Sequence, residues 1–335
     1  MISLRLDRFA FEPGKAHSRK DIMVLEVGNT AQVSVATATL WAASDSPHDA
    51  DRLALGTPSA VRDWVAGMTR DERVNGLNGR TESQILLGDK VIVTEIQDTW
   101  AKVIVTDQAN NADPRGYPGW VPLDQLTTDT NTDTGLDHVV SATATSIRDE
   151  PDGEVLIPGV SMGTRIQILD EEPYRGWGRA ILPGPQQPGW IRMRDVALAP
   201  KTDIPAAAGR TESVNLASQF LDVPYVWGGL SAYGVDCSGL VYLVFRQLGI
   251  SLPRDAGDQA EATRPIKDDE VQAGDLFFFA YPGKPIHHIG LATQRNNDGE
   301  LTMIHAAGSY GKVVQEAITG DRAETYVGAH SVFAE

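Results

Sequence analysis

Hydrophobic and polar residues alternate in short runs through the first part of the chain, and the runs come in the same order twice. Period-two alternation between Gly, Pro and Asp turns is typical of β-strands with one buried face. We therefore predict two copies of a small all-β unit, at 31–127 and 138–198, after an N-terminal extension at 1–30. The matching segments are 33–39 and 139–145, 88–93 and 163–168, 100–103 and 177–180, and 118–121 and 188–191.

Two polar stretches, 127–135 and 199–209, are typical of linkers between these units. The first unit also carries an insertion at 57–80. There Thr57-Pro58 has the form of an N-cap followed by proline at the first helical position, and apolar residues recur at helical spacing from Val61 to Met68. We expect a short helix and a polar loop that either pack on the β-unit or help to wall a site.

The pattern changes from about residue 210, where helical and strand-like segments mix. A helix is predicted at 214–221, and a second at 237–248 with a buried stripe at helical spacing. Asp236 stands where an N-cap belongs, and Gly249 where a C′ glycine belongs. Three apolar runs, 275–279, 288–292 and 302–306, predict strands that follow the helix. The third region is therefore α+β.

Composition narrows the class of protein. The 335 residues carry a net charge of −16 and no basic block, which argues against nucleic acid or an anionic membrane surface as partner. No apolar run is long enough for a membrane span. The N-terminal residues lack the apolar core of a signal peptide, so we expect a cytoplasmic protein, or a secreted or periplasmic one if a leader has been removed. Composition leaves the oligomeric state open.

The single cysteine, Cys237, excludes an intrachain disulfide and is a candidate nucleophile. It falls in the first turn of the predicted helix, where unpaired N–H groups and the helix dipole favour a thiolate. His288 and His305 lie in consecutive predicted strands and can supply a base and a group that orients it. The alternative is a buried structural cysteine with two ordinary polar histidines.

A zinc site is the other chemistry that these residue types allow. His287 and His288 are consecutive in a strand and should point to opposite faces, so a closed four-ligand site is not expected. We predict no metal and no other cofactor.

Six motif blocks, in order, resemble those of the NlpC-type cell-wall cysteine peptidases. The resemblance covers 210–335 and implies a papain-like fold, with Cys237 as nucleophile, His288 as base and His305 as the orienting residue. It also implies that Tyr225 approaches the nucleophile, to stabilise the oxyanion or position the thiol. The blocks are Pro224-Tyr225-Val226-Trp227-Gly228-Gly229, Asp236-Cys237-Ser238-Gly239-Leu240-Val241, Pro253-Arg254-Asp255, Gly274-Asp275-Leu276, His288-Ile289-Gly290 and Ile304-His305-Ala306.

The two β-units resemble bacterial SH3-like barrels, and the whole architecture resembles that of γ-D-glutamyl-L-diamino-acid endopeptidases that recycle wall fragments. This resemblance implies a peptidoglycan stem peptide with a free N-terminal L-Ala as substrate, held at its amine by Asp236 and Ser238. It implies that Glu82 and Tyr117 of the first β-unit close the amine pocket. Arg254 faces either a substrate carboxylate or a structural ion-pair partner. The resemblance leaves the choice between lysine and diaminopimelate open.

Two other functions fit the same residues. One is a general cell-wall peptide hydrolase or amidase on the same Cys–His scaffold, since fold similarity does not fix the substrate. The other is a non-catalytic protein whose β-units bind the cell wall.

Overall fold

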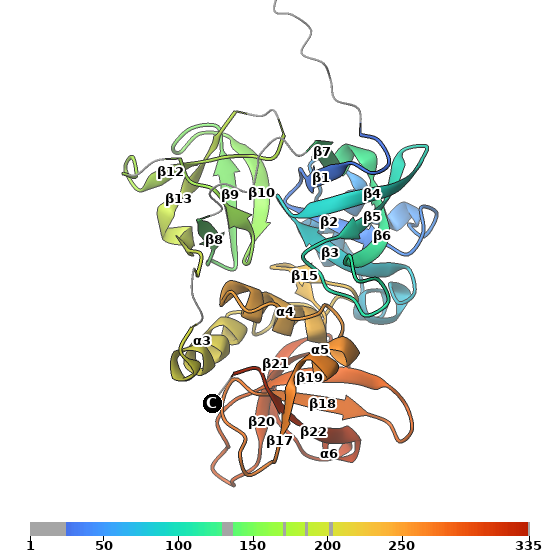
Figure 1. Ribbon diagram of the computed structural model, residues 1–335, viewed down its shortest axis with the longest axis vertical. Coiled ribbons are helices and arrows are strands. Elements are labelled where there is room, and N and C mark those ends of the chain that lie inside the picture. The colour runs from blue at the N-terminus through green and yellow to red at the C-terminus, as the bar shows by residue number, and fades with distance from the viewer. Residues whose placement is uncertain (1–24, 129–136, 170–171, 185–186, 201–203, 334–335) are drawn as a thin grey trace, which may run out of the picture.

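The computed structural model describes residues 25–128, 137–169, 172–184, 187–200 and 204–333. Most of the predicted N-terminal extension and of the predicted linker at 127–135 lies outside these ranges. The described chain forms two antiparallel β-units and a C-terminal α+β unit, and Figure 1 shows the β-units side by side above the C-terminal unit.

The two β-units have the same strand order. The first forms a single antiparallel sheet in the order β3-β2-β6-β5-β4-β1-β7. The second has the same order, β10-β9-β13-β12 and β11-β8-β14, divided into two sheets. The strands are β1 (Thr30–Val33), β2 (Thr37–Trp41), β3 (Thr81–Leu86), β4 (Lys90–Gln97), β5 (Trp100–Val105), β6 (Tyr117–Pro122) and β7 (Leu126–Thr128), then β8 (His138–Val140), β9 (Ala144–Arg148), β10 (Val155–Ser161), β11 (Arg165–Ile166), β12 (Trp177–Ala180), β13 (Gly189–Arg192) and β14 (Val196–Leu198).

The insertion of the first unit holds α2 (Val61–Gly67) and a π-helical turn, η2 (Glu72–Gly76). A further short helix, α1 (Arg52–Leu55), comes just before the insertion. The prediction that Thr57 caps a helix beginning at Pro58 is wrong, because α2 begins at Val61 with Ala60 in the capping position. The predicted apolar face is buried: Trp64 packs against Trp41 of β2, with ring centroids 6.1 Å apart.

The C-terminal unit is a helical layer on a six-stranded antiparallel sheet of order β17-β22-β18-β19-β20-β21 (Figure 1). Its first helix, α3, begins at Ala206 rather than 214, because the strong helix formers at 206–208 directly follow Pro205 and extend it. The elements are α3 (Ala206–Ser218), β15 (Leu230–Ser231), β16 (Gly234–Val235), α4 (Cys237–Gln247), α5 (Ala256–Ala262), β17 (Arg264–Ile266), β18 (Leu276–Ala280), β19 (Ile286–Ala292), β20 (Thr302–Ala307), β21 (Lys312–Ala317), α6 (Asp321–Thr325) and β22 (Tyr326–Ser331).

Helix α4 is the centre of this unit, and all eleven of its residues are buried. Asp236 accepts the N–H of Gly239 at 2.6 Å, as an N-cap does, and Gly249 adopts φ +75°, as a C′ glycine does. Leu240, Phe245 and their neighbours pack against β19 and β20 in the largest core. Burying each such side chain stabilises the fold by about 1.5–3 kcal/mol.

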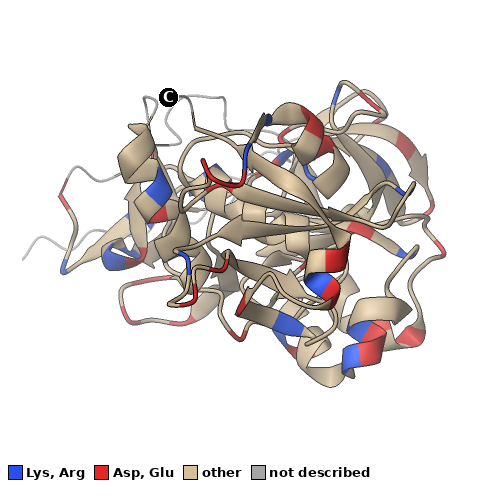
Figure 2. Ribbon diagram, turned by 90° about the horizontal axis from the view of Figure 1, so that it is seen from below, with Lys and Arg blue, Asp and Glu red and all other residues tan. Residues whose placement is uncertain are grey.

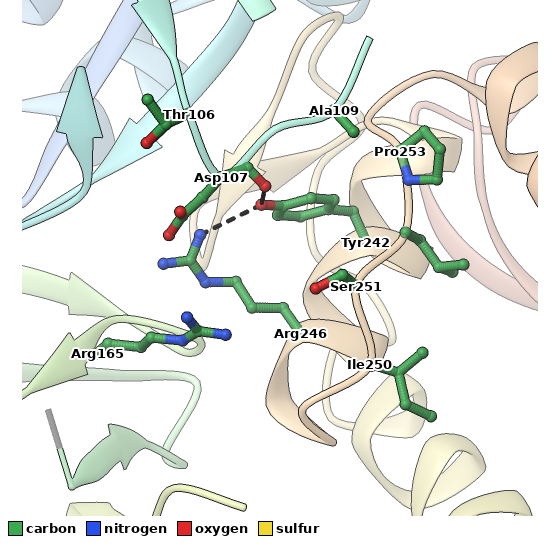
Figure 3. Close-up of a pocket in the computed structure, with 10 residues that line it drawn as sticks. Thr106, Asp107, Ala109, Arg165, Tyr242, Arg246, Ile250, Ser251 and Pro253 are labelled. Carbon is green, nitrogen blue, oxygen red and sulfur yellow. Dashed lines mark hydrogen bonds between the residues drawn. The ribbon is translucent and has the colours of Figure 1, made fainter. Parts of the chain in front are cut away.

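The C-terminal end of α4 joins the three units. Arg246 is buried, forms an ion pair with Asp89 of the first β-unit, and donates from Nε to the carbonyl of Gly163 in the second at 3.0 Å. The Tyr242 hydroxyl donates to the carbonyl of Asp107 at 2.8 Å. A cavity of about 440 Å³ lies beside these groups, and Arg165 of β11 lines its other side (Figure 3). The orientation of the β-units is therefore tied to the helix that begins with Cys237.

Acidic and basic residues are interspersed over the helices and loops visible in Figure 2, without a basic cluster in that view. Among the described residues, every helix is too short or too polar to cross a bilayer.

Replacing Arg246 by alanine should lower the free energy of unfolding by about 3–5 kcal/mol, because Asp89 would stay buried without its partner. Arg115→Ala removes the same side chain from an exposed pair with Asp113 and should cost less than about 1 kcal/mol. Urea unfolding of both variants measures the difference. Equal losses would show that the joint contributes no more than a surface pair.

Candidate active site

Cys237 is the first residue of α4 and lies against β19. Its side chain is buried, and its Sγ is approached by the backbone N–H groups of Ser238, in the helix's first turn, and of Ile289, next to His288. The cap formed by Asp236 fixes where the helix begins, and therefore where the thiol stands. The predicted meeting of the cysteine with the first histidine strand is confirmed.

The two histidines form a hydrogen-bonded chain. His288 Nε2 lies 2.7 Å from His305 Nδ1, and both side chains are buried. Gly290 makes this contact possible, because a Cβ there would stand 3.3 Å from the His305 Cβ and 2.5 Å from the sulfur of Met303. His287 is exposed on the opposite face and stacks on Tyr281, with ring centroids 4.6 Å apart.

Burial governs the charge states of the Cys237 thiol and of His288. Burial raises the pKa of Cys237 to about 12, and the nearby Asp236 acts in the same direction. Burial also holds the pKa of His288 well below its usual range, with further contributions from His305 and Arg322. The expectation of a thiolate at the helix start is therefore wrong for the resting site, because desolvation outweighs the N–H groups of Ser238 and Ile289. The pair rests as neutral thiol and neutral imidazole.

Tyr225 lies beside the nucleophile, as expected from the sequence. Its hydroxyl is buried, and burial, Cys237 and Asp236 together raise its pKa well above the ordinary value. The phenol therefore keeps its proton and can donate a hydrogen bond. The backbone N–H of Cys237, in the first turn of α4, is the second donor available to an oxyanion.

Arg254 is buried and occupied by protein groups. Its Nη1 and Nη2 donate to the two carboxylate oxygens of Asp236 at 3.0 and 2.7 Å. The remaining donors reach the hydroxyls of Ser83 and Ser238 and the carbonyl of Gly229. Of the two roles left open by the sequence, the structure assigns Arg254 to an ion pair rather than to a substrate carboxylate.

The same network occupies Asp236 and Ser238. The Asp236 carboxylate accepts five hydrogen bonds, including those from Gly228 and Gly239, which fills the lone pairs of a carboxylate. The Ser238 hydroxyl donates to Asp236 and accepts from Arg254. Both groups are thus hydrogen-bonded within the protein, and their role at a substrate amine stays a prediction.

Two carboxylates and a phenol meet at the border of the first β-unit and the C-terminal unit. The Tyr117 hydroxyl of β6 donates to Asp255 Oδ2 at 3.0 Å. Burial, and then the charge of Asp255, raises the pKa of Glu82 on β3. Burial likewise raises the pKa of Asp255, which is next to Arg254. The predicted pair Glu82 and Tyr117 thus converges, and Asp255 is a third member that sequence reasoning missed although it ends the Pro253-Arg254-Asp255 block.

The insertion of the first β-unit also reaches this site. Arg70 donates from Nε and Nη2 to the carbonyl of Gly308 at 3.1 and 2.8 Å. The N–H of Trp227 donates to the carbonyl of Arg73 at 3.0 Å. A Cβ on Gly308 would stand 3.9 Å from the Tyr225 ring. Of the two expectations for the insertion, both hold: α2 packs on its own unit, and the turn after it walls the region around Tyr225.

A buried cysteine at a helix start, with a two-histidine chain on neighbouring strands, defines the site of a cysteine peptidase. The NlpC/P60 family model matches residues 222–331. Two relatives are called gamma-D-glutamyl-L-lysine dipeptidyl-peptidase. The protein of Bacillus subtilis (strain 168) is 37% identical over 76% of this chain and 84% of its own, and that of Bacillus cereus (strain ATCC 10987 / NRS 248) is 33% identical over 89% and 86%.

A crystal structure of an NlpC/P60 family protein from Bacillus cereus ATCC 10987 is similar across all three units. It shares 30% identity, with a TM-score of 0.80, over 90% of this chain and 99% of that one. The chain belongs to the NlpC/P60 family, and it is a cysteine peptidase.

The raised pKa of Cys237 gives the thiol a characteristic response to iodoacetamide. In the folded protein the alkylation rate should still rise at alkaline pH where the rate of the urea-unfolded chain, with a thiol pKa near ~8.5, has levelled off. Intact mass follows the reaction, because Cys237 is the single cysteine. Steric shielding alone would lower the rate without moving its pH dependence. A plateau that begins in mildly acidic buffer would instead show a resting thiolate–imidazolium pair.

Proposed function

We propose that the protein is an endopeptidase that cleaves the γ-D-glutamyl–L-diamino acid bond of peptidoglycan stem peptides with a free N-terminal L-Ala. The observation that carries the proposal is the pair of half-buried carboxylates, Glu82 and Asp255, beside the cysteine site. Their raised pKa values, and the absence of any ion pair to either acid among the described residues, indicate a place suited to a cation. The names of the Bacillus relatives support the same bond.

The cation that fits is the substrate's terminal ammonium. An ammonium between Glu82 and Asp255 would relieve their mutual repulsion and form charge-assisted hydrogen bonds. Tyr117 holds Asp255 in place from the first β-unit. Next to Asp255 in the chain, Arg254 donates hydrogen bonds to Asp236 and Ser238. In this proposal the length of peptide on the amine side is limited by the first β-unit, and the enzyme acts on small fragments.

The reaction begins with a neutral thiol. As Sγ of Cys237 bonds to the γ-glutamyl carbonyl carbon, its proton passes to His288 and the carbonyl electron pair moves to oxygen. The Tyr225 hydroxyl and the N–H of Cys237 stabilise that oxyanion. Collapse expels the diamino acid amine, which takes the proton from His288. Water then gives a proton to His288 and attacks the thioester, which releases the glutamyl product and returns the proton to sulfur.

We further propose that the β-units are bacterial SH3-like barrels and that the enzyme recycles soluble wall fragments in the cytoplasm. The shared strand order of the two units supports the first part. The net charge of −16 supports the second, since it disfavours binding to polyanionic wall polymers. A fractionation of cells that places the protein with the intact wall would contradict this location.

Replacing Cys237 by alanine should abolish cleavage of L-Ala-γ-D-Glu-L-Lys and of its diaminopimelate counterpart, since no other thiol is present. Mass spectrometry of the released diamino acid measures the reaction, and comparing the two peptides identifies the preferred diamino acid. Cleavage that persists in the variant would refute the nucleophile. A wild-type protein that cleaves neither peptide would refute the substrate class.

Replacing Glu82 by glutamine should lower kcat/KM for the free-amine peptide by roughly 10- to 100-fold, which corresponds to losing a charged hydrogen bond of about 1.5–3 kcal/mol. The loss should fall mainly on KM. Glu95→Gln, which removes an exposed charge from β4 of the same unit, is the matched control and should leave the kinetics unchanged. Because the pKa of Glu82 is raised, KM of the wild type should also increase as pH falls from neutral. Equal kinetics for both variants would remove Glu82 from the amine site.

A further inference from the structure

A carboxylate stands at the far end of the two-histidine chain. Glu316 lies on β21, two residues beyond Val314, which is the register partner of His305, so Glu316 and His305 share a face of the sheet. Its Oε1 lies 2.9 Å from His305 Nε2, although off the direction of a well-aligned hydrogen bond. The hydrogen-bonded pair of His288 and His305 therefore continues to Glu316.

Two further groups hold this carboxylate. Arg322 of α6 donates from Nε to Glu316 Oε1 at 3.0 Å, and the Tyr310 hydroxyl also donates to the carboxylate. The His305 imidazole has the largest influence on Glu316 and, with Arg322, lowers the pKa of its carboxyl to about 2. Glu316 is therefore ionised at neutral pH, where it can only accept hydrogen bonds.

An ionised acceptor at this position determines where the imidazole protons sit. His305 Nε2 must carry a proton to face the carboxylate, so in neutral His305 the Nδ1 atom is an acceptor. The contact of 2.7 Å then requires the proton on His288 Nε2. That arrangement leaves His288 Nδ1 with a free lone pair, as the basic atom for the thiol proton.

We propose that Glu316 is a positioning residue that sets this tautomer and stabilises the positive charge that the two imidazoles acquire when the thiol loses its proton. The inference rests on the proposed function, in which the proton moves from Sγ to His288 during attack. It matters here because the resting pair is neutral, so the imidazolium has to be created on the way to the transition state. A fixed negative charge on the histidine chain lowers the energy of that state more than that of the resting one.

The charged and titratable groups around the pair divide into two sets. Glu316 on β21 favours the protonated imidazoles. Arg322 on α6 opposes protonation of both, and His287 on β19 opposes protonation of His288. Tyr310 is neutral, and the thiol of Cys237 is neutral at rest. Removing Glu316 or Arg322 should therefore shift protonation in opposite directions.

The test is the pH dependence of kcat/KM for Glu316→Gln and Arg322→Gln, which keep side-chain size. Glu316→Gln should lower kcat by roughly 10- to 100-fold with little change in KM, and should move the acid limb to lower pH because the base loses its proton more readily. Arg322→Gln should move that limb to higher pH. Glu324→Gln, an exposed change on the same helix as Arg322, is the matched control and should change neither.

A loss of rate in Glu316→Gln with an unmoved acid limb would show a merely structural residue and overturn the proposal, as would shifts of the same sign in the two variants. The tautomer has a readout that needs no substrate. In ¹⁵N spectra of the histidine rings, wild-type His305 should carry its proton on Nε2, and Glu316→Gln should mix the two tautomers. Unchanged spectra would also overturn the role of Glu316. If the wild type cleaves neither stem peptide, the proposed function fails, and these spectra still decide the role of Glu316.

Discussion

The buried ion pair between Asp236 and Arg254 is the contact on which the rest of the site depends. Asp236 caps α4 and so fixes the first residue of that helix, Cys237. Arg254 uses all five N–H donors on Asp236, Ser238, Gly229 and Ser83 of the first β-unit. A buried guanidinium is tolerated only when its donors are satisfied. Because Arg254 binds both the capping residue Asp236 and Ser83, the position of the thiol and the docking of the first β-unit depend on each other.

Burial of the site determines its chemistry. The thiol and the imidazole are neutral because both are desolvated. The charges therefore form only during the reaction, and catalysis depends on groups that stabilise them as they form. In the proposed mechanism, Tyr225 and the first N–H of α4 stabilise the developing oxyanion, and the histidine chain receives the proton. Glu82 and Asp255, at the border of two units, form no ion pair among the described residues. Burial makes the carboxylates of Glu82 and Asp255 costly to ionise, so a positively charged substrate group between them would be strongly favoured.

Local patterns predicted the helix at Cys237, its cap and the two histidine strands. They also predicted that the strand segments of the two β-units recur in the same order along the chain. These features depend on neighbouring residues in the chain. The sequence did not reveal Glu316, because its contact with His305 depends on the register of β20 with β21. It did not reveal Asp255 as a partner of Tyr117, because the two come from different units. The sequence also led to the wrong expectation for the ionisation state of the Cys237 thiol. A helix terminus can be predicted from sequence, whereas the depth of burial around it cannot.

The central claim is that the first β-unit completes the active site by holding a free substrate amine. The most direct measurement is kcat/KM for L-Ala-γ-D-Glu-L-Lys and for the same peptide acetylated at its N-terminus. Acetylation removes the charge and adds bulk against Glu82 and Asp255, so kcat/KM should fall by at least about 100-fold, as expected when buried polar groups lose their partner. Equal values for the two peptides would show that the amine is not recognised and would contradict the claim.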